Sequence, residues 1–338
     1  MKTTGRIAVV VLFCAILVGL FVQLGGDSGR HLYKETRSSL YTLVTITVVG
    51  DSPEKARKAC DAAYLELERL GRLLNFYAAD SEISAINRNA GIKPVGVSKD
   101  TLDIIKAAVY VSEQTEGGFD ITVGPIVKLW DFKKKVVPSA ASIAERMPFV
   151  GYKNIVIDTA ASTVYLKKVG VQMDLGGILK GFAADKAAEI LKENGIEDGI
   201  VAVAGDIKLF GRQPDGRPWN IGIQNPRPKG DNDALLATVN LGTQGVSTSG
   251  AYPRYFMQDG IRYHHLLNPG TGYPESLCRS VTVIAPEATL TDAFATGIFI
   301  MGPQKGITAL EKLGLDGIIV DKDGAILVTK GVKEQVHL

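Results

Sequence analysis

The order in which strand-like and helix-like segments follow one another constrains the fold of this chain most. Strands, recognised by two-residue alternation and β-branched residues, are predicted near 40–49, 154–158, 163–167, 171–175, 200–204, 219–224, 235–240, 280–285 and 317–321. Helices, recognised by apolar residues at helical spacing, are predicted near 54–74, 98–115, 181–193, 290–300 and 303–313. The two kinds do not alternate strictly, as they would in a doubly wound sheet, so the predicted class is α+β with mixed sheets and flanking helices.

The first residues resemble a targeting segment. Lys2 and Arg6 precede an apolar run, Ile7–Val22, and no small-residue cleavage site follows it. This favours an uncleaved membrane anchor over a cleaved signal peptide, with the rest of the chain outside the cytoplasm. A lipid-modified Cys14 is less favoured, because bulky Leu12 and Phe13 precede it. The predicted organisation is an anchor or signal at 1–26, a linker at 27–38 and one large domain at 39–338.

Net charge argues against nucleic acid as a partner. The 338 residues carry 38 Lys and Arg against 36 Asp and Glu, a formal net charge of +2. Lys2, Arg6 and Arg30 against Asp27 account for all of it, so residues 31–338 are neutral overall. A neutral body lacks the basic surface on which sequence-independent nucleic-acid binding depends.

Cysteine and glycine say less about chemistry. The three cysteines lie far apart and form no C-x-x-C pair, so neither a disulfide framework nor a thiolate zinc site is implied; a Cys60–Cys278 bridge is an alternative that we do not favour. Glycine is abundant, with 37 residues. Many of these glycines fall in the motifs below, where we expect them to let the backbone approach a ligand.

The segment 171–181 predicts a strand that runs through three glycines into a helix. Backbone amides at a helix start, with Lys180 beside them, suit a phosphate group. A tight turn with Lys180 in solvent explains the same residues equally well. The segment is neither a Walker loop nor a G-x-G-x-x-G fingerprint.

Asp292 and Thr296 stand one helical turn apart in the predicted helix 290–300. Two hard oxygen donors so placed suit Mg²⁺, which takes few carboxylates and completes its shell with water and phosphate. Taken alone, the segment is better explained by capping, because Thr289-x-x-Asp292 is a variant of the capping box.

Three other polar segments leave their roles open. His264 and His265 are adjacent, so at most one of them is expected to face a site, as a general base or as an ordinary surface residue; no third ligand supports zinc. The segment 245–250, with Ser249 and Gly250, suits phosphate or sugar contacts or a turn, and it lacks the G-x-S-x-G of hydrolases. Asp120 could contact a ligand or cap the next element.

Together and in this order, the segments resemble the FAD:protein FMN transferase (ApbE) family from about Ser39 to Val328. The matching motifs are Ser81-Glu82-Ile83-Ser84-x-x-Asn87, GGFDITVGPIVKLW, MDLGGILKGFAAD, AGDI at 204–207, STSG at 247–250, HHLLNPGTGYP and LTDAFATGIFIMG. Each motif is weak alone, but seven in order are specific.

The resemblance implies an exported enzyme that uses Mg²⁺ to cleave the pyrophosphate of FAD, transfers FMN to a threonine or serine hydroxyl of an acceptor flavoprotein and releases AMP. By the same resemblance, Gly177, Asp292 and Thr296 bind the metal, and His265 is the candidate base alongside catalytic Asp292. The residues that it places at FAD are Asn75, Phe76, Asp120, Lys180, Ser249, Gly250 and Leu266.

The chain departs from the family pattern at three positions. The family usually has an acidic residue at Asn268, a basic one at Gly270 and an acidic one at Ala251. These departures leave the metal ligands intact but bear on acceptor choice and on the balance between transfer and hydrolysis. Two alternatives therefore remain, an FAD pyrophosphatase and a non-catalytic FAD-binding protein. Neither the acceptor nor the oligomeric state follows from the sequence.

Overall fold

The computed structural model describes residues 22–24, 29–227, 234–252 and 254–334. Most of the predicted anchor, 1–21 and 25–26, lies outside these residues. Within the described part of the chain, no helix is both long and apolar enough to cross a bilayer.

A nine-stranded sheet forms the centre of the fold, and all of its neighbouring strands are antiparallel. An antiparallel sheet needs no helical crossover between neighbours, which agrees with the α+β prediction. The strands, in spatial order, are β1 (Val22–Leu24), β2 (His31–Ser39), β3 (Thr42–Gly50), β7 (Gly199–Val203), β8 (Asp206–Phe210), β11 (Gly245–Gly250), β14 (Cys278–Ala285), β15 (Asp316–Asp321) and β16 (Ile326–Val328).

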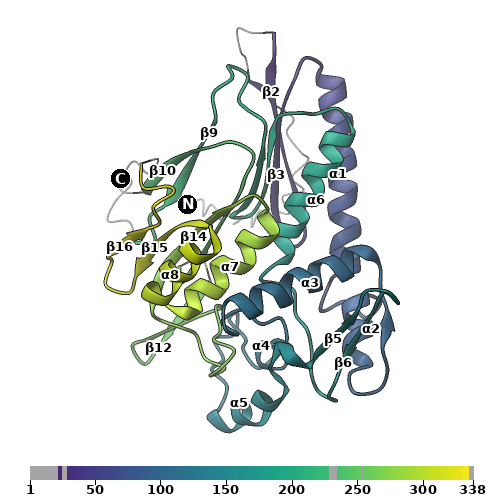
Figure 1. Cartoon of the computed structure of the whole chain (residues 1–338), viewed down its shortest axis with the longest axis vertical. Coiled ribbons are helices and arrows are strands. Elements are labelled where there is room, and N and C mark those ends of the chain that lie inside the picture. The colour runs from purple at the N-terminus through teal and green to yellow at the C-terminus, as the bar shows by residue number, and fades with distance from the viewer. Residues whose placement is uncertain (1–21, 25–28, 228–233, 253, 335–338) are drawn as a thin grey trace, which may run out of the picture.

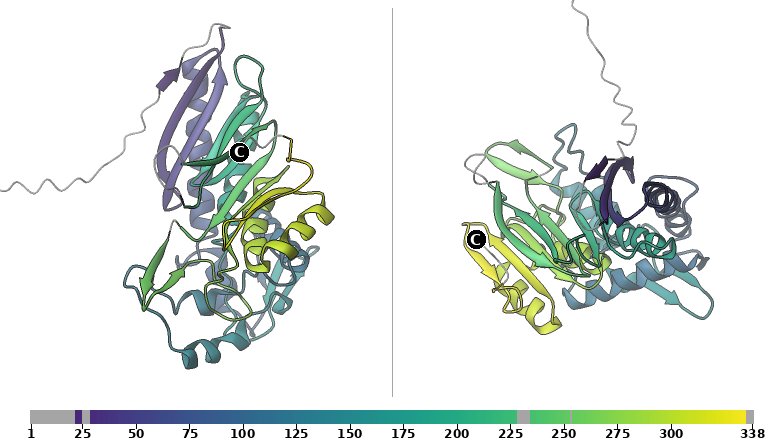
Figure 2. Two further views of the ribbon diagram at one scale, coloured as in Figure 1. Left: turned by 90° about the vertical axis from the view of Figure 1, so that its left-hand side faces the viewer. Right: turned by 90° about the horizontal axis from the view of Figure 1, so that it is seen from above.

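Four helices cover one face of this sheet. They are α1 (Pro53–Leu73), α6 (Leu179–Glu193), α7 (Ala288–Met301) and α8 (Pro303–Leu313), and α1, α6 and α7 lie side by side (Figure 1). A hairpin of β9 (Trp219–Gln224) and β10 (Leu235–Leu241) covers part of the other face with its own apolar cluster. The sheet is therefore sandwiched between a helical layer and a hairpin (Figure 2).

A second group of short elements gathers at one end of the helical layer (Figure 1). The longest of them, α3 (Lys99–Gln114), packs against α7. The others are α2 (Glu82–Arg88), α4 (Gly124–Val127), α5 (Ala140–Arg146), the 3₁₀ turns Met147–Phe149 and Tyr152–Asn154, the small sheet of β4 (Val95–Gly96), β5 (Ile155–Asp158) and β6 (Thr163–Leu166), and the hairpin β12 (Tyr255–Gln258) and β13 (Ile261–His264).

The predicted linker 27–38 is wrong for most of its length, because β2 occupies His31–Ser39 and pairs with β3 over nine residues. The strand was not predicted because its sequence contains several polar and charged residues. Tyr33 and Glu35 face the core, and Arg37 donates to the Glu35 carboxylate at 2.8 Å. The ion pair lets a charged residue occupy a core position.

The predicted strand 171–175 is also wrong. Its alternation is real, since Val171, Met173 and Leu175 are buried, but its backbone makes only an isolated parallel bridge, between Gln172 and Val123, and belongs to no strand of a sheet. The Asn87 side chain supplies the hydrogen bonds that a neighbouring strand would make: its Nδ2 donates to the Met173 carbonyl at 2.9 Å, and its Oδ1 accepts from the Met173 N–H at 2.7 Å. The segment is thus fixed as an extended connection into α6. Cys60 and Cys278 are both free and buried, so they form no bridge.

Candidate active site

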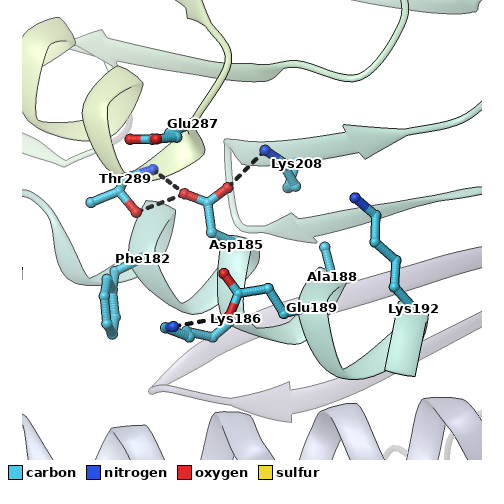
Figure 3. A pocket seen from close by; sticks show the side chains of 9 residues that line it. All are labelled: Phe182, Asp185, Lys186, Ala188, Glu189, Lys192, Lys208, Glu287 and Thr289. Atoms are coloured by element: carbon cyan, nitrogen blue, oxygen red, sulfur yellow. Dashed lines mark hydrogen bonds and ion pairs between the residues drawn. The ribbon is translucent and has the colours of Figure 1, made fainter. Parts of the chain in front are cut away.

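Asp292 is the fifth residue of α7 and does not cap that helix. Its Oδ2 accepts from the backbone N–H of Gly181 at 3.0 Å, across to α6. The cap of α7 comes from Asp185, whose carboxylate accepts from the N–H groups of Ala288 and Thr289 at 3.0 and 2.8 Å and ion-pairs with Lys208 (Figure 3). The capping-box interpretation of Asp292 is therefore wrong, and its carboxylate is available for another role.

The contact between α6 and α7 depends on Gly181. A Cβ at this position would lie 2.0 Å from the carbonyl oxygen of Ala288 and 2.8 Å from Cβ of Asp292. Only glycine permits this approach of the two helices, which brings the start of α6 to the second turn of α7. At Gly181, then, the missing side chain accommodates another part of the protein, not a ligand as we expected.

Lys180 lies between two carboxylates and is 35% exposed, so it is not the unpaired solvated residue of the alternative interpretation. Its ammonium ion-pairs with Asp206 at the start of β8 and reaches Asp292 Oδ1 at 3.5 Å. We call Lys180, Asp206 and Asp292 the Lys180 cluster. Burial alone would lower the pKa of the Lys180 ammonium, but the charges of Asp292 and Asp206 outweigh it and the net shift is upward.

In a simple ion pair the pKa of a carboxyl falls, whereas the pKa of Asp292 is raised. The side chain is 4% exposed, and burial raises the pKa of its carboxyl. The nearby Asp206 carboxylate raises it further, whereas Lys180 and the Gly181 N–H lower it. A buried carboxyl with a raised pKa beside a second carboxylate is a typical feature of functional sites.

Thr296 lies one turn beyond Asp292, as the helical spacing predicted, and adds hydroxyl oxygen to the site. Its Oγ1 is 3.0 Å from Oγ of Ser249, near the end of β11. A Cβ on Gly177 would lie 3.8 Å from the same Oγ1, so the glycine turn before α6 passes beside Thr296. The structure thus brings together the three residues expected to bind the metal.

The two histidines differ in their hydrogen bonds. His264 is buried, and both of its ring nitrogens face backbone groups: Nε2 lies 2.6 Å from the Glu275 carbonyl, and Nδ1 accepts from the Leu266 N–H at 3.3 Å. His265 has one such contact, from Nδ1 to the Arg254 carbonyl at 3.3 Å. A carbonyl can only accept, so Nδ1 carries the proton and Nε2 keeps its lone pair.

Of the two adjacent histidines, His265 is the one whose Nε2 is left to take up a proton. Burial lowers its pKa to about 4, and the positive charges of Arg254 and Lys180 contribute to the shift. The ring is therefore neutral at neutral pH. Leu266, the next residue, is buried in the main core beside it, with its N–H bonded to His264.

Asn75 and Phe76 follow α1. The Asn75 amide donates to the Tyr41 hydroxyl at 2.8 Å, and the Phe76 ring lies 4.7 Å from Nζ of Lys128. Lys128 in turn is close enough to Asp174 to oppose the rise in pKa that burial gives this carboxyl. Lys128 and Asp174 therefore connect the residues after α1 to the glycine turn before α6, because Asp174 accepts from the N–H of Gly176 at 2.8 Å.

Asp120 fixes a loop, and both of its oxygens are occupied. Oδ1 accepts from the N–H and hydroxyl of Thr122 at 2.7 and 2.6 Å, and Oδ2 accepts from the N–H of Tyr152 at 2.7 Å. The next helix, α4, has no side-chain cap, so these bonds fix the loop and are not the cap that the sequence offered as an alternative. Gly250 is similarly enclosed, since a Cβ there would lie 2.4 Å from the ring of Tyr252.

Sequence reasoning did not assign a role to Asp206, Asp174 or Arg254. The first two stand inside motifs that the family resemblance used, AGDI and MDLGG, and their acidic side chains were the available signal. The Arg254 carbonyl accepts from His265, and the positive charge of Arg254 lowers the pKa of Tyr77, which burial and Asp174 raise. No sequence motif marked it.

The arrangement corresponds to a known family. A family model described as ApbE matches residues 40–319, most of the chain. The chain belongs to the ApbE family. This confirms the predicted family and, with it, an enzyme of the transferase class.

Curated relatives and solved structures agree with this assignment. Proteins named FAD:protein FMN transferase from Treponema pallidum and Vibrio cholerae are 30% and 35% identical to the chain. The first match covers 96% of this chain and 94% of the relative, and the second covers 83% and 84%. The crystal structure of the ApbE protein from Thermotoga maritima superposes with a TM-score of 0.83 at 34% identity, covering 91% of this chain and 100% of that one. The flavin transferase ApbE from V. cholerae gives 0.80 at 28%, covering 90% and 99%.

Proposed function

We propose that this chain is an Mg²⁺-dependent FAD:protein FMN transferase that moves FMN from FAD to a threonine or serine hydroxyl of an exported acceptor flavoprotein and releases AMP. The observation that carries the proposal is the meeting of Asp292, Thr296 and Gly177 at the α6–α7 crossing. Relatives with the same fold are named for this reaction.

The residues at the crossing fit Mg²⁺. The donors are a carboxylate, a hydroxyl and a backbone carbonyl, all hard oxygens of the kind that this ion prefers. No cluster of three or more His, Cys, Asp or Glu side chains suited to a metal exists in the described part of the chain, which is consistent with an ion held largely by water and substrate oxygens. When bound, Mg²⁺ would neutralise charge on the diphosphate and on the departing AMP.

The charge of the Lys180 cluster supports this assignment. Two carboxylates and one ammonium leave a net charge of −1, counting Asp206, Asp292 and Lys180 as ionised. A diphosphate brought beside them adds further negative charge in a partly buried site, where such repulsion is weakly screened. An additional cation is therefore needed, and Lys180 alone does not supply it.

The chain's own groups account for the proton transfer. The acceptor hydroxyl oxygen attacks the FMN-side phosphorus, and the bond from that phosphorus to the AMP oxygen breaks. The hydroxyl proton passes to Nε2 of His265, the ring nitrogen with a free lone pair, while the Arg254 carbonyl holds the opposite Nδ1–H. The negative charge that develops on the AMP phosphate leaves with AMP.

We also propose that the reaction takes place outside the cytoplasm, with the chain held at the membrane by its first residues. The apolar run Ile7–Val22 after Lys2 and Arg6 supports this placement. Separation of cell membranes from soluble fractions, with protease added from the outer side, tests it. Recovery of the intact chain in the cytoplasmic soluble fraction would refute it.

The decisive assay incubates the full chain with FAD, Mg²⁺ and candidate acceptor domains, then measures AMP and protein-bound flavin fluorescence on a denaturing gel. AMP together with labelled acceptor supports the transferase. AMP without label indicates the pyrophosphatase, and neither product indicates the FAD-binding protein. Chelation should abolish both products if the metal assignment is correct.

Asp292→Asn tests the metal ligand itself, because asparagine retains an oxygen that can accept from Gly181. Loss of a charged ligand worth several kcal/mol should lower turnover at least about 100-fold while FAD still binds. Asp103→Asn on α3, whose half-buried carboxylate pairs with Lys99, is the matched control and should be unaffected. Full turnover by Asp292→Asn would exclude Asp292 as a metal ligand.

A further inference from the structure

A cavity of about 120 Å³ lies between β13, β14 and the loops around them, and four of its lining residues are cationic. They are Arg227, Arg262, Arg279 and Lys322, and we call this cavity the basic pocket. No Asp or Glu lines it among the residues that the structure describes. Such a concentration of positive charge is unexpected in a chain whose body is neutral.

The three guanidinium groups lack carboxylate partners within the described ranges of the chain, whereas Lys322 ion-pairs with Asp323 at 2.7 Å. Arg262 stacks 3.8 Å from the centre of the Tyr255 ring, and Arg279 donates to the Lys322 carbonyl at 3.0 Å. Partial burial lowers the pKa of Arg227, and the charges of Arg279 and Arg262 lower it further. The cations thus repel one another, and an anion among them would relieve that repulsion.

The basic pocket lies next to the candidate active site. Ala251, which lines the pocket, stands two residues after Ser249, whose hydroxyl contacts Thr296. The strand pairing continues through Ala251, since its N–H donates to the Arg279 carbonyl at 3.1 Å. Two residues along a strand span about 7 Å. A ligand anchored in the pocket could therefore extend to the metal site within a few residues.

Apolar side chains stand beside the pocket. In the β12–β13 hairpin, Tyr255 pairs with His264 and Met257 pairs with Arg262, so all four side chains share one face. His264 and Arg262 line the pocket, whereas Tyr255 and Met257 are 43% and 53% exposed. A cationic pocket flanked by exposed apolar side chains is suited to a peptide segment with an acidic residue.

The size of the pocket favours a single side chain over a nucleotide. Its volume is well below the roughly 300–1,000 Å³ of pockets that enclose a small-molecule ligand. A carboxylate fits this space and can accept bidentate hydrogen bonds from arginine. In the proposed function, the phosphates of FAD lie with the divalent ion beside the Lys180 cluster.

We propose that the basic pocket binds a carboxylate side chain of the acceptor protein, and so positions the neighbouring hydroxyl for flavin transfer. The inference rests on the proposed function for the identity of the partner. The interaction itself is measurable without any transfer, because it predicts which peptides the chain binds.

The test measures fluorescence anisotropy of two labelled 12-residue peptides with the full chain and FAD. One peptide carries a threonine and three aspartates, and the other has asparagine in place of the aspartates. The aspartate peptide should bind about tenfold more tightly, and Arg227→Gln or Arg279→Gln should each weaken it about five- to tenfold. Ala251→Asp, which adds a carboxylate to the pocket, should weaken it as well. Raising the salt concentration should reduce the difference between the peptides.

Arg57→Gln, on the exposed face of α1, is the charge-matched control and should change neither peptide. FAD affinity, followed by flavin fluorescence, should stay within about twofold in all the variants, since the pocket is separate from the phosphate site. The proposal is overturned if the two peptides bind equally, if neither binds at millimolar concentration, or if Arg227→Gln and Arg279→Gln have no effect. If AMP or inorganic phosphate displaces the peptide and these variants weaken FAD in parallel, the pocket holds nucleotide phosphate instead. Failure of the wild-type chain to label any acceptor refutes the proposed function and leaves this binding result standing.

Discussion

Replacing Gly181 by alanine should damage both the stability of the protein and its active site. The new Cβ would lie 2.0 Å from the Ala288 carbonyl oxygen, whereas ordinary contacts begin near 3.4 Å. Helices α6 and α7 would have to separate locally by about 1.4 Å, the difference between these distances. The Gly181 N–H to Asp292 Oδ2 distance of 3.0 Å would then exceed hydrogen-bonding range.

The magnitude follows from three contributions. Overpacking costs about 1–3 kcal/mol, and the lost hydrogen bond to a charged group costs about 1.5–3 kcal/mol. Alanine in place of glycine inside a helix returns about 1 kcal/mol. We therefore expect the free energy of unfolding to fall by about 1.5–5 kcal/mol, with a larger loss of flavin transfer because Asp292 is displaced.

Urea unfolding and the AMP-release assay measure the two effects. Gly71→Ala in α1 is the matched helical control, because its Cβ would meet only the tip of the Leu40 side chain at 2.9 Å, which can rotate away. That variant should be within about 1 kcal/mol of wild type. If Gly181→Ala is as stable and active as Gly71→Ala, the close contact of α6 and α7 is not required, and our account of how Asp292 is positioned is wrong.

Three further predictions concern the ionisable groups of the site. His265→Gln should lose transfer activity with little change in stability, whereas His264→Gln should lower the melting temperature, because both ring nitrogens of His264 meet backbone groups; the reverse pattern would exchange their roles. In the folded state the pKa values of both histidines lie below their ordinary value, and that of His265 is about 4. The stability that their neutral forms provide is therefore complete above about pH 6.5 and declines as the pH falls towards 4. Urea midpoints measured across that range should show this decline, and the decline should be shallower in His265→Gln. Lys180→Met should destabilise the fold by leaving Asp206 and Asp292 together without a cation, and a stability profile against pH should show recovery on mild acidification as one carboxylate is protonated; no pH-dependent recovery would mean that the two carboxylates do not interact.

Local patterns predicted most elements of the fold but not how charged residues take core positions. The helices α1, α3, α6, α7 and α8 and several strands follow apolar periodicity, and each was found close to its predicted range. Strand β2 was not predicted, because the burial of Glu35 depends on Arg37, which pairs with Asp61 of α1 in a separate segment. Strand β11 looked like a turn, because Ser247 and Ser249 satisfy their hydroxyls against α7.

In the candidate site, too, local sequence patterns did not predict contacts between distant segments. The spacing of Asp292 and Thr296 identified a shared helical face, but the sequence alone favoured the cap. What decided the question was Asp185, which is more than a hundred residues away from the helix start that it caps. The partner of Lys180 at Asp206 likewise depends on the packing of α6 against β8, which no local pattern encodes.

Charge at the two sites argues that recognition by this enzyme is local. The body of the chain is neutral, so long-range attraction cannot guide FAD or an acidic acceptor to it. The Lys180 cluster is net negative and the basic pocket is positive, and only the end of β11, from Ser249 to Ala251, separates them. The divalent ion and a carboxylate would each find the opposite charge only within a Debye length of about 8 Å at physiological salt. Substrate binding should therefore depend on the divalent ion and acceptor binding on ionic strength, and titrating each variable separately resolves the two steps.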